Sequence, residues 1–154
     1  MLIGSPECKA FCTWQRLNEA RSPDVGRMRR LKIEAQLHMD FVASLYLEQL
    51  QDGLYFLHEH PRFASSWKLP CIEELLKVDG VNIVRGDQCQ YGAQANHGPT
   101  RGSPILKPTG FMSNSSKVLE ALSRRCEGRN GLCTRPNGGQ HVVLEGKLAR
   151  EAAK

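Results

Sequence analysis

Residues 27–57, RMRRLKIEAQLHMDFVASLYLEQLQDGLYFL, place a long helical pattern directly before a short apolar run. Apolar residues recur every four positions, at Leu37, Phe41 and Leu45. This spacing predicts one helix over about 27–51, which Asp52-Gly53 ends. The next four residues are continuously apolar, as in a strand that is buried on both faces. The stretch therefore predicts a helix followed by an internal strand at 54–57.

Strand and helix patterns alternate on both sides of this stretch. Strands are predicted from short apolar runs at residues 1–4, 81–84, 111–112 and 141–144. Helices are predicted at 71–78 and at 117–125, and Ser115 or Ser116 can cap the second. Such alternation is typical of an α/β fold with a mainly parallel sheet. We therefore predict an α/β domain over residues 1–125 and a loop-rich basic C-terminal segment over 126–154.

The composition indicates a folded protein without a membrane-spanning helix. The 154 residues are 40% hydrophobic and 24% charged, and no apolar run approaches the roughly 18 residues of a membrane span. The first residues lack the basic start of a signal peptide, so the six cysteines are expected to be reduced thiols of an intracellular protein, cytoplasmic or nuclear. The net charge of +5 is compatible with a nucleic-acid partner.

Cys8 and Glu59 occupy positions that favour chemistry. Cys8 follows the first predicted strand on a loop that Pro6 stiffens, and Glu59 follows the apolar run. Ligands of an α/β sheet bind beyond the carboxyl ends of its strands, so two parallel neighbours would bring both side chains to one edge. A thiolate there can attack a ring carbon while a carboxyl group protonates a ring nitrogen. The alternative is a structural cysteine and an ordinary loop carboxylate.

Four ordered motifs resemble those of cytosine-5 DNA methyltransferases. Ser5-Pro6-Glu7-Cys8 after a strand resembles the family's Cys loop, and Glu59-His60-Pro61 resembles its Glu-Asn motif. The other two motifs are Asp87–Gly92 and Lys107–Asn114. The resemblance implies a partial Rossmann-like sheet in which Cys8 attacks C6 of a flipped-out cytosine and Glu59 contacts the base. It further implies that Lys107 lies near the target base.

The same resemblance implies that the chain is incomplete as a methyltransferase. The family binds S-adenosylmethionine through motifs that precede the Cys loop, whereas this sequence begins at that loop. Glu7 stands where the family has proline, and its charge disfavours a thiolate at Cys8. We therefore expect an N-terminally truncated, degenerate fragment that is inactive alone. Only a missing N-terminal half would supply the S-adenosylmethionine site.

A second resemblance covers about residues 3–154. The combined motifs are similar to a stretch of copia-type retroelement polyproteins that lies ahead of the reverse transcriptase. This resemblance implies the alternative function, a non-catalytic segment that binds nucleic acid or takes part in assembly. Its partners would be DNA, RNA or the rest of a polyprotein. A membrane is not expected among them. Candidate phosphate contacts are Arg27, Arg29, Arg30, Lys32, Arg124 and Arg125. A third hypothesis is a gene product without function.

Cys126, Cys133 and His141, with Cys89 as a further candidate, are residues of metal-ligating type. Their spacing lacks the short Cys-x2-4-Cys knuckle of structural zinc sites. The spacing therefore favours separate structural roles and no metal, and zinc binding is the less favoured alternative.

Overall fold

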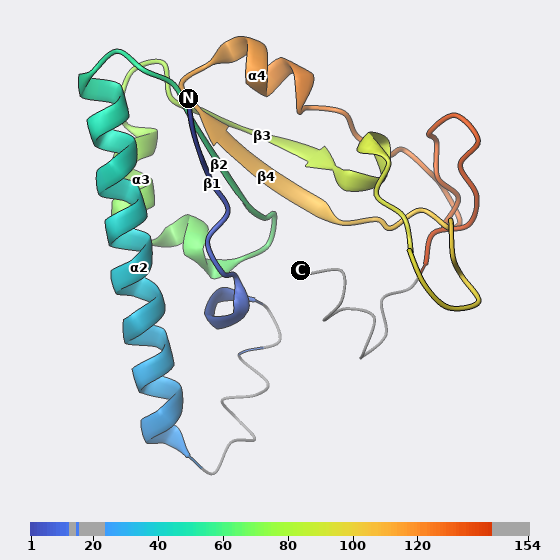
Figure 1. Cartoon of the computed structure of the whole chain (residues 1–154), viewed down its shortest axis with the longest axis horizontal. Coiled ribbons are helices and arrows are strands. Elements are labelled where there is room, and N and C mark those ends of the chain that lie inside the picture. The colour runs from blue at the N-terminus through green and yellow to red at the C-terminus, as the bar shows by residue number, and fades with distance from the viewer. Residues whose placement is uncertain (13–14, 16–23, 143–154) are drawn as a thin grey trace. The chain divides into compact units, whose positions relative to one another are not determined.

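The computed structural model describes residues 1–12, 15 and 24–142 (Figure 1). Its strands are β1 (Leu2–Gly4), β2 (Phe56–Pro61), β3 (Asn82–Asp87) and β4 (Pro108–Ser113). Its α-helices are α2 (Val25–Gln51), α3 (Pro70–Leu76) and α4 (Ser116–Ala121), and short 3-10 turns are η1 (Lys9–Phe11), η2 (Ser65–Lys68) and η3 (Gln88–Tyr91). The predicted strand at 141–144 extends beyond the described residues.

The four strands form one sheet in the order β1-β2-β4-β3, with helices beside it. The mixed α/β class is therefore confirmed. β1 and β2 are parallel, with Leu2 opposite Phe56 and Gly4 opposite His58. The end of β4 meets the start of β2, where the Ser113 hydroxyl donates a hydrogen bond to the Phe56 carbonyl at 2.5 Å, so these two strands are antiparallel.

The sheet is mostly antiparallel, and the expected Rossmann-like, mainly parallel sheet is not confirmed. The reason lies in the position of β4. The helix α3 connects β2 to β3, as the alternation predicted, but β4 lies between these two strands and pairs with both. Two parallel strands joined by a helix can be adjacent, or an antiparallel strand can lie between them. The sequence shows the same alternation of strands and helices in both cases.

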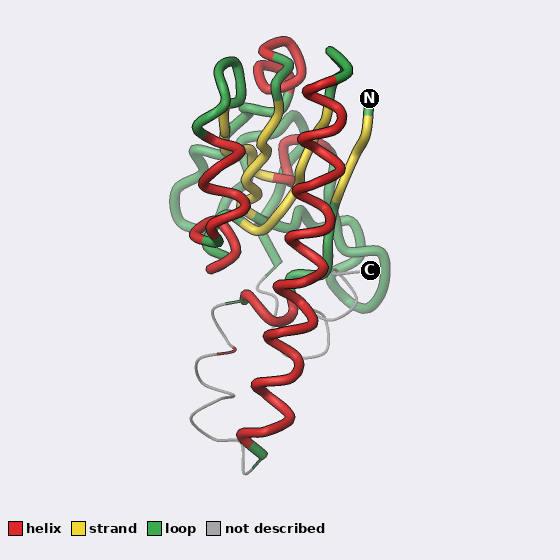
Figure 2. Tube along the Cα trace, turned by 90° about the vertical axis from the view of Figure 1, so that its left-hand side faces the viewer, coloured by secondary structure: helices red, strands yellow, loops and turns green. Residues whose placement is uncertain are grey.

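The predicted long helix is confirmed as α2 (Figure 2). The Asp24 side chain caps it by accepting a hydrogen bond from the Arg27 amide at 2.8 Å. The chain leaves the helix at Gly53, whose φ of +66° favours glycine. Helix α2 contacts β1 and β2 and buries the side chains Met39, Ala43 and Tyr46. Burial of this stripe, more than helix propensity, fixes α2 on the sheet.

The strand predicted at 54–57 is shifted. β2 spans Phe56–Pro61, and its buried face alternates through Phe56, His58 and His60. Two hydroxyl groups allow this polar sequence to enter the core: Tyr46 Oη lies 3.1 Å from Nδ1 of His58, and Ser66 Oγ lies 2.6 Å from Nδ1 of His60. The Nδ1 atom of each ring thus has a partner inside the core, and the strand continues through both histidines.

The described chain forms two compact units. The first unit comprises Met1–Val84 and Gly110–Leu122, and the second unit comprises Arg85–Thr109 and Ser123–Lys154. The predicted domain boundary between residues 125 and 126 falls inside the second unit. The main hydrophobic cluster, which includes Tyr46, Phe56 and Met112, belongs to the first unit. No helix in the described ranges is both long and apolar enough to cross a bilayer.

Candidate functional site

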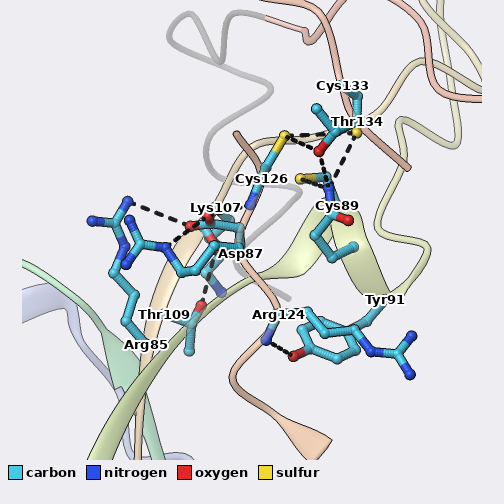
Figure 3. A network of polar contacts seen from close by, with 12 residues as sticks. Arg85, Asp87, Cys89, Tyr91, Lys107, Thr109, Arg124, Cys126, Cys133 and Thr134 are labelled. Atoms are coloured by element: carbon cyan, nitrogen blue, oxygen red, sulfur yellow. Dashed lines mark hydrogen bonds and ion pairs between the residues drawn. The ribbon is translucent and has the colours of Figure 1, made fainter. Parts of the chain in front are cut away.

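Three cysteines and one histidine from distant parts of the sequence gather in the second unit. Their ligand atoms all lie within 4.8 Å of one another, and we name Cys89, Cys126, Cys133 and His141 the four-donor cluster. Sγ of Cys126 lies 4.0 Å from Sγ of Cys133 and 3.6 Å from Nε2 of His141. Figure 3 shows the sulfur atoms of the three cysteines turned toward one another.

A buried carboxylate, Asp87, holds the segment that carries Cys126. Its Oδ2 accepts hydrogen bonds from the Cys126 amide at 2.8 Å and from Nε of Arg125 at 3.3 Å (Figure 3). Arg85 lies 3.5 Å from Oδ1, and the Asp87 side chain is only 1% exposed. Because Asp87 directly precedes η3, this carboxylate links the turn that carries Cys89 to the Cys126 segment.

The last two members of the cluster are brought together by backbone hydrogen bonds. The Cys133 amide donates to the Gly139 carbonyl at 2.9 Å, and the His141 amide donates to the Gly131 carbonyl at 2.7 Å. Gly131 has a φ of +78°, which disfavours a side chain. A Cβ on Gly128 would collide with the Leu132 carbonyl. The loop is therefore built around glycines and places both donors on the same side.

Polar groups around the cluster point at its sulfur atoms. The Thr134 hydroxyl lies 3.7 Å from Sγ of Cys126, and Nε2 of Gln90 lies 3.8 Å from the sulfurs of both Cys89 and Cys133. Burial acts to raise the pKa of Cys126, but hydrogen bonds from the Thr134 and Gly128 amides and from the Thr134 hydroxyl outweigh it and lower the pKa to about 6. Burial and the neighbouring thiols raise the pKa of Cys89 to about 12.

Two of the three predicted catalytic residues, Cys8 and Glu59, lie on or after the neighbouring, parallel strands β1 and β2. The Ser5 hydroxyl, beyond the end of β1, donates to a Glu59 carboxylate oxygen at 2.5 Å. Glu59 lies within β2 rather than after it, because the strand continues to Pro61. Cys8 is half-buried at the start of η1. These contacts give Glu59 a defined position, and the catalytic roles stay predictions.

Lys107 is placed in the second unit, whereas Cys8 and Glu59 belong to the first. Its carbonyl accepts hydrogen bonds from the Gln88 amide at 3.1 Å and from the Thr109 hydroxyl at 3.2 Å. These hydrogen bonds give the Lys107 backbone a structural role beside η3. A role of its ammonium group near a target base stays a prediction.

The predicted phosphate contacts fall into two groups. Four are exposed on the first turns of α2, at Arg27, Arg29, Arg30 and Lys32. The other two precede Cys126 in the second unit. The Arg124 guanidinium lies over the Tyr91 ring at 6.0 Å from its centroid, and the Arg124 amide donates to the Tyr91 hydroxyl at 2.8 Å. Arg125 pairs with Asp87 and keeps 47% of its side chain exposed.

Positive charge is concentrated in the second unit. Its described residues, 85–109 and 123–142, contain six arginines and one lysine against only Asp87 and Glu127. The first unit has eleven basic and twelve acidic residues by sequence, which nearly cancel. The described residues of the second unit therefore carry a net charge of +5, whereas the first unit carries −1 by sequence.

No protein-family model, curated protein or solved structure matches the chain. Function is therefore inferred from the chain's own geometry and charge. Sequence reasoning disfavoured the cluster because it has no short Cys-x2-4-Cys knuckle. The feature that could have predicted it is the grouping of Cys126, Cys133 and His141 in a glycine-rich loop, with Cys89 in the turn that follows the strand predicted at 81–84.

Proposed function

We propose that this protein is a non-catalytic nucleic-acid-binding module whose second unit contacts the phosphate backbone. The observation that carries the proposal is the charge of the described part of that unit, which has seven basic residues and two acidic residues. A phosphate backbone attracts such a surface regardless of sequence, and binding releases condensed counterions.

The kind of cation supports nucleic acid as the partner. Arginine outnumbers lysine six to one in these residues, and its planar guanidinium binds phosphate oxygens in pairs. Arg101, Arg124 and Arg129 are exposed. Arg85 and Arg125 help to neutralise the buried Asp87, and Arg135 lies within hydrogen-bond distance of the Ala93 and Gly102 carbonyls. We therefore assign phosphate contact first to Arg101, Arg124 and Arg129.

The proposal agrees with the context that the sequence resemblance implies. A basic module without a catalytic site suits an intracellular assembly segment of a copia-type polyprotein, in the cytoplasm or the nucleus. The basic first turns of α2 are the second predicted contact with nucleic acid. They lie in a unit whose charges nearly cancel, so we expect them to contribute less to affinity.

Fluorescence anisotropy with a labelled duplex and a labelled single-stranded RNA tests the proposal. We expect affinity to fall steeply between about 50 and 200 mM salt. In a plot of log affinity against log salt concentration, the double variant Arg124→Gln/Arg129→Gln should have a shallower slope, by about 0.9 for each duplex phosphate contact that is lost. The variant Arg27→Gln/Arg29→Gln makes the same charge change on α2 and is the matched control. Affinity that is independent of salt, or equal losses in both variants, would contradict the proposal.

A second candidate function is a methyltransferase-like fragment that retains a nucleophile loop. It is favoured by the parallel pairing of β1 with β2 and by the Ser5–Glu59 hydrogen bond. In this candidate Cys8 attacks C6 of a target cytosine and Glu59 contacts the base. Addition of the Cys8 thiolate to C6 makes the C5 hydrogen exchange with water without a methyl donor, so the chain should release tritium from a duplex that carries C5-tritiated cytosine. Cys8→Ala should abolish this exchange, and Cys12→Ala should preserve it. No exchange with the unmodified chain rejects this candidate.

A further inference from the structure

We propose that Cys89, Cys126, Cys133 and His141 bind one Zn2+ ion in a closed, structural site. This inference goes beyond nucleic-acid binding because it concerns what holds the second unit together. It rests on the positions of the four donor atoms, on the kind of donor and on the weak apolar core around them.

The distances fit a tetrahedral ion. With Zn–S near 2.3 Å and Zn–N near 2.0–2.1 Å, tetrahedral angles require roughly 3.8 Å between two sulfurs and roughly 3.6 Å between sulfur and nitrogen. The cluster has 4.0 Å between the sulfurs of Cys126 and Cys133 and 3.6 Å from Cys126 to Nε2 of His141. Since all four donors lie within 4.8 Å of one another, small side-chain shifts suffice to complete the coordination.

A disulfide explains the cluster less well. A disulfide bond is about 2.05 Å long, whereas Cys126 and Cys133 are 4.0 Å apart and all three cysteines are free thiols. A disulfide bond between any two of the cysteines would not explain why the third thiol and the imidazole of His141 lie beside it. Three sulfurs and one ring nitrogen that all lie within 4.8 Å of one another form a ligand set.

The second unit needs a cross-link because its apolar core is small. Among the described residues, twelve buried apolar side chains belong to the first unit, and the second unit has only Cys89, Ala95 and Ile105. A unit of this kind buries too little apolar surface to offset the chain entropy of its long loops. An ion bound by three separate segments supplies that missing stabilisation, as in small metal-dependent domains.

The donor set selects the ion. Thiolates and imidazole are the preferred ligands of zinc, whereas calcium and magnesium need oxygen donors, and the cluster contains none. The Asp87 carboxylate, which holds the Cys126 segment, is occupied by the Cys126 amide and by Arg125. Four protein donors fill a tetrahedral shell, so no position is left for a reactive water and the site is structural.

Zinc content and cobalt spectra of the full chain test the proposal. The chain purified without chelators should hold one zinc ion, and Co2+ added to the demetallated chain should give the intense visible bands of tetrahedral cobalt with thiolate-to-cobalt charge transfer. Cys126→Ser and His141→Ala each remove a proposed ligand and should weaken metal binding by at least about 100-fold. Loss of a hydrogen-bond partner of a ligand typically weakens metal binding by up to about 100-fold, so loss of the ligand itself should have at least that effect. Cys12→Ser, a half-buried thiol of the first unit, is the matched control and should bind like the unmodified chain.

A rescue variant separates loss of a ligand from loss of folding. His141→Cys keeps four tetrahedral donors, so it should retain the metal and increase the charge-transfer intensity in proportion to a fourth thiolate. Absence of zinc together with octahedral, weakly coloured cobalt in the unmodified chain would overturn the proposal. So would equal metal binding by Cys126→Ser and Cys12→Ser.

Discussion

Acidification should destabilise the first unit through His58, which lies buried in β2. Tyr46, His60 and Trp67 surround its ring, and the rings of His58 and Trp67 meet edge to face at 5.3 Å. Burial, with a smaller contribution from repulsion by His60, lowers the pKa of His58 from 6.5 to about 3. Between these two pH values the unfolded chain binds a proton that the folded chain does not bind, so the free energy of unfolding falls as the pH falls.

The expected loss can be worked out from the two pKa values. At about pH 5 the unfolded imidazole is almost fully protonated and the folded one is neutral, which removes about 2 kcal/mol relative to about pH 8. Urea unfolding followed by tryptophan fluorescence and circular dichroism at both pH values measures the loss. A loss that continues toward pH 3 is expected, because the folded pKa lies near that value.

Two variants isolate the contribution of His58. His58→Gln keeps a polar partner for Tyr46 but does not titrate, so its pH dependence should be flatter by about 2 kcal/mol over the same range. His38→Gln removes an exposed histidine of α2 and should behave like the unmodified chain. Proton-linked changes elsewhere are common to all three proteins and cancel in the comparison. If His58→Gln loses as much stability as the unmodified chain, the reasoning is refuted.

Three further substitutions test separate parts of the account. Gly4→Ala places a Cβ where it collides with the Tyr46 hydroxyl and should cost about 1–3 kcal/mol of unfolding free energy in chemical denaturation. Asp87→Asn weakens the contact with the Cys126 amide and should lower zinc affinity about 10–100-fold in a chelator competition assay. Ser115→Ala removes the N-cap of α4 and should cost about 1 kcal/mol in thermal unfolding.

Each of these substitutions has a control or an opposing result. A Cβ on Gly139 meets no atom within 4 Å, so Gly139→Ala should change stability by less than about 0.5 kcal/mol. Asp79→Asn, at an exposed acidic residue outside the second unit, should leave zinc affinity unchanged. Unchanged stability in Gly4→Ala or Ser115→Ala would show that the contact in question does not contribute to stability. Unchanged zinc affinity in Asp87→Asn would show that the contact with the Cys126 amide does not contribute to zinc binding.

Local patterns predicted the helices better than the sheet. The helix α2 and the cap at Ser115 follow from contacts within a few residues, and both are confirmed. The predicted apolar face is wrong, because Leu37 and Phe41 are exposed and the buried stripe is Met39, Ala43 and Tyr46. The parallel pairing of β1 with β2 is also present. The place of β4 between β2 and β3 depends on contacts between strands far apart in the sequence. Alternation of strands and helices does not distinguish that order from a parallel one.

Polar residues explain why strand β2 and the four-donor cluster differ from what the sequence predicted. His58 and His60 ended the predicted strand, yet hydroxyl partners from α2 and η2 admit both rings to the core. The four-donor cluster was disfavoured because zinc motifs are recognised by closely spaced cysteine pairs. Here Cys89 and Cys126 stand 37 positions apart, and only the folded second unit brings them together.

Zinc-edge X-ray absorption of the full chain is the most direct test of the metal site that we infer. We expect a shell of three sulfur atoms near 2.3 Å and one nitrogen near 2.0–2.1 Å. In His141→Cys the nitrogen should be replaced by a fourth sulfur. A shell dominated by oxygen or nitrogen atoms, or one that is unchanged in His141→Cys, would contradict the account.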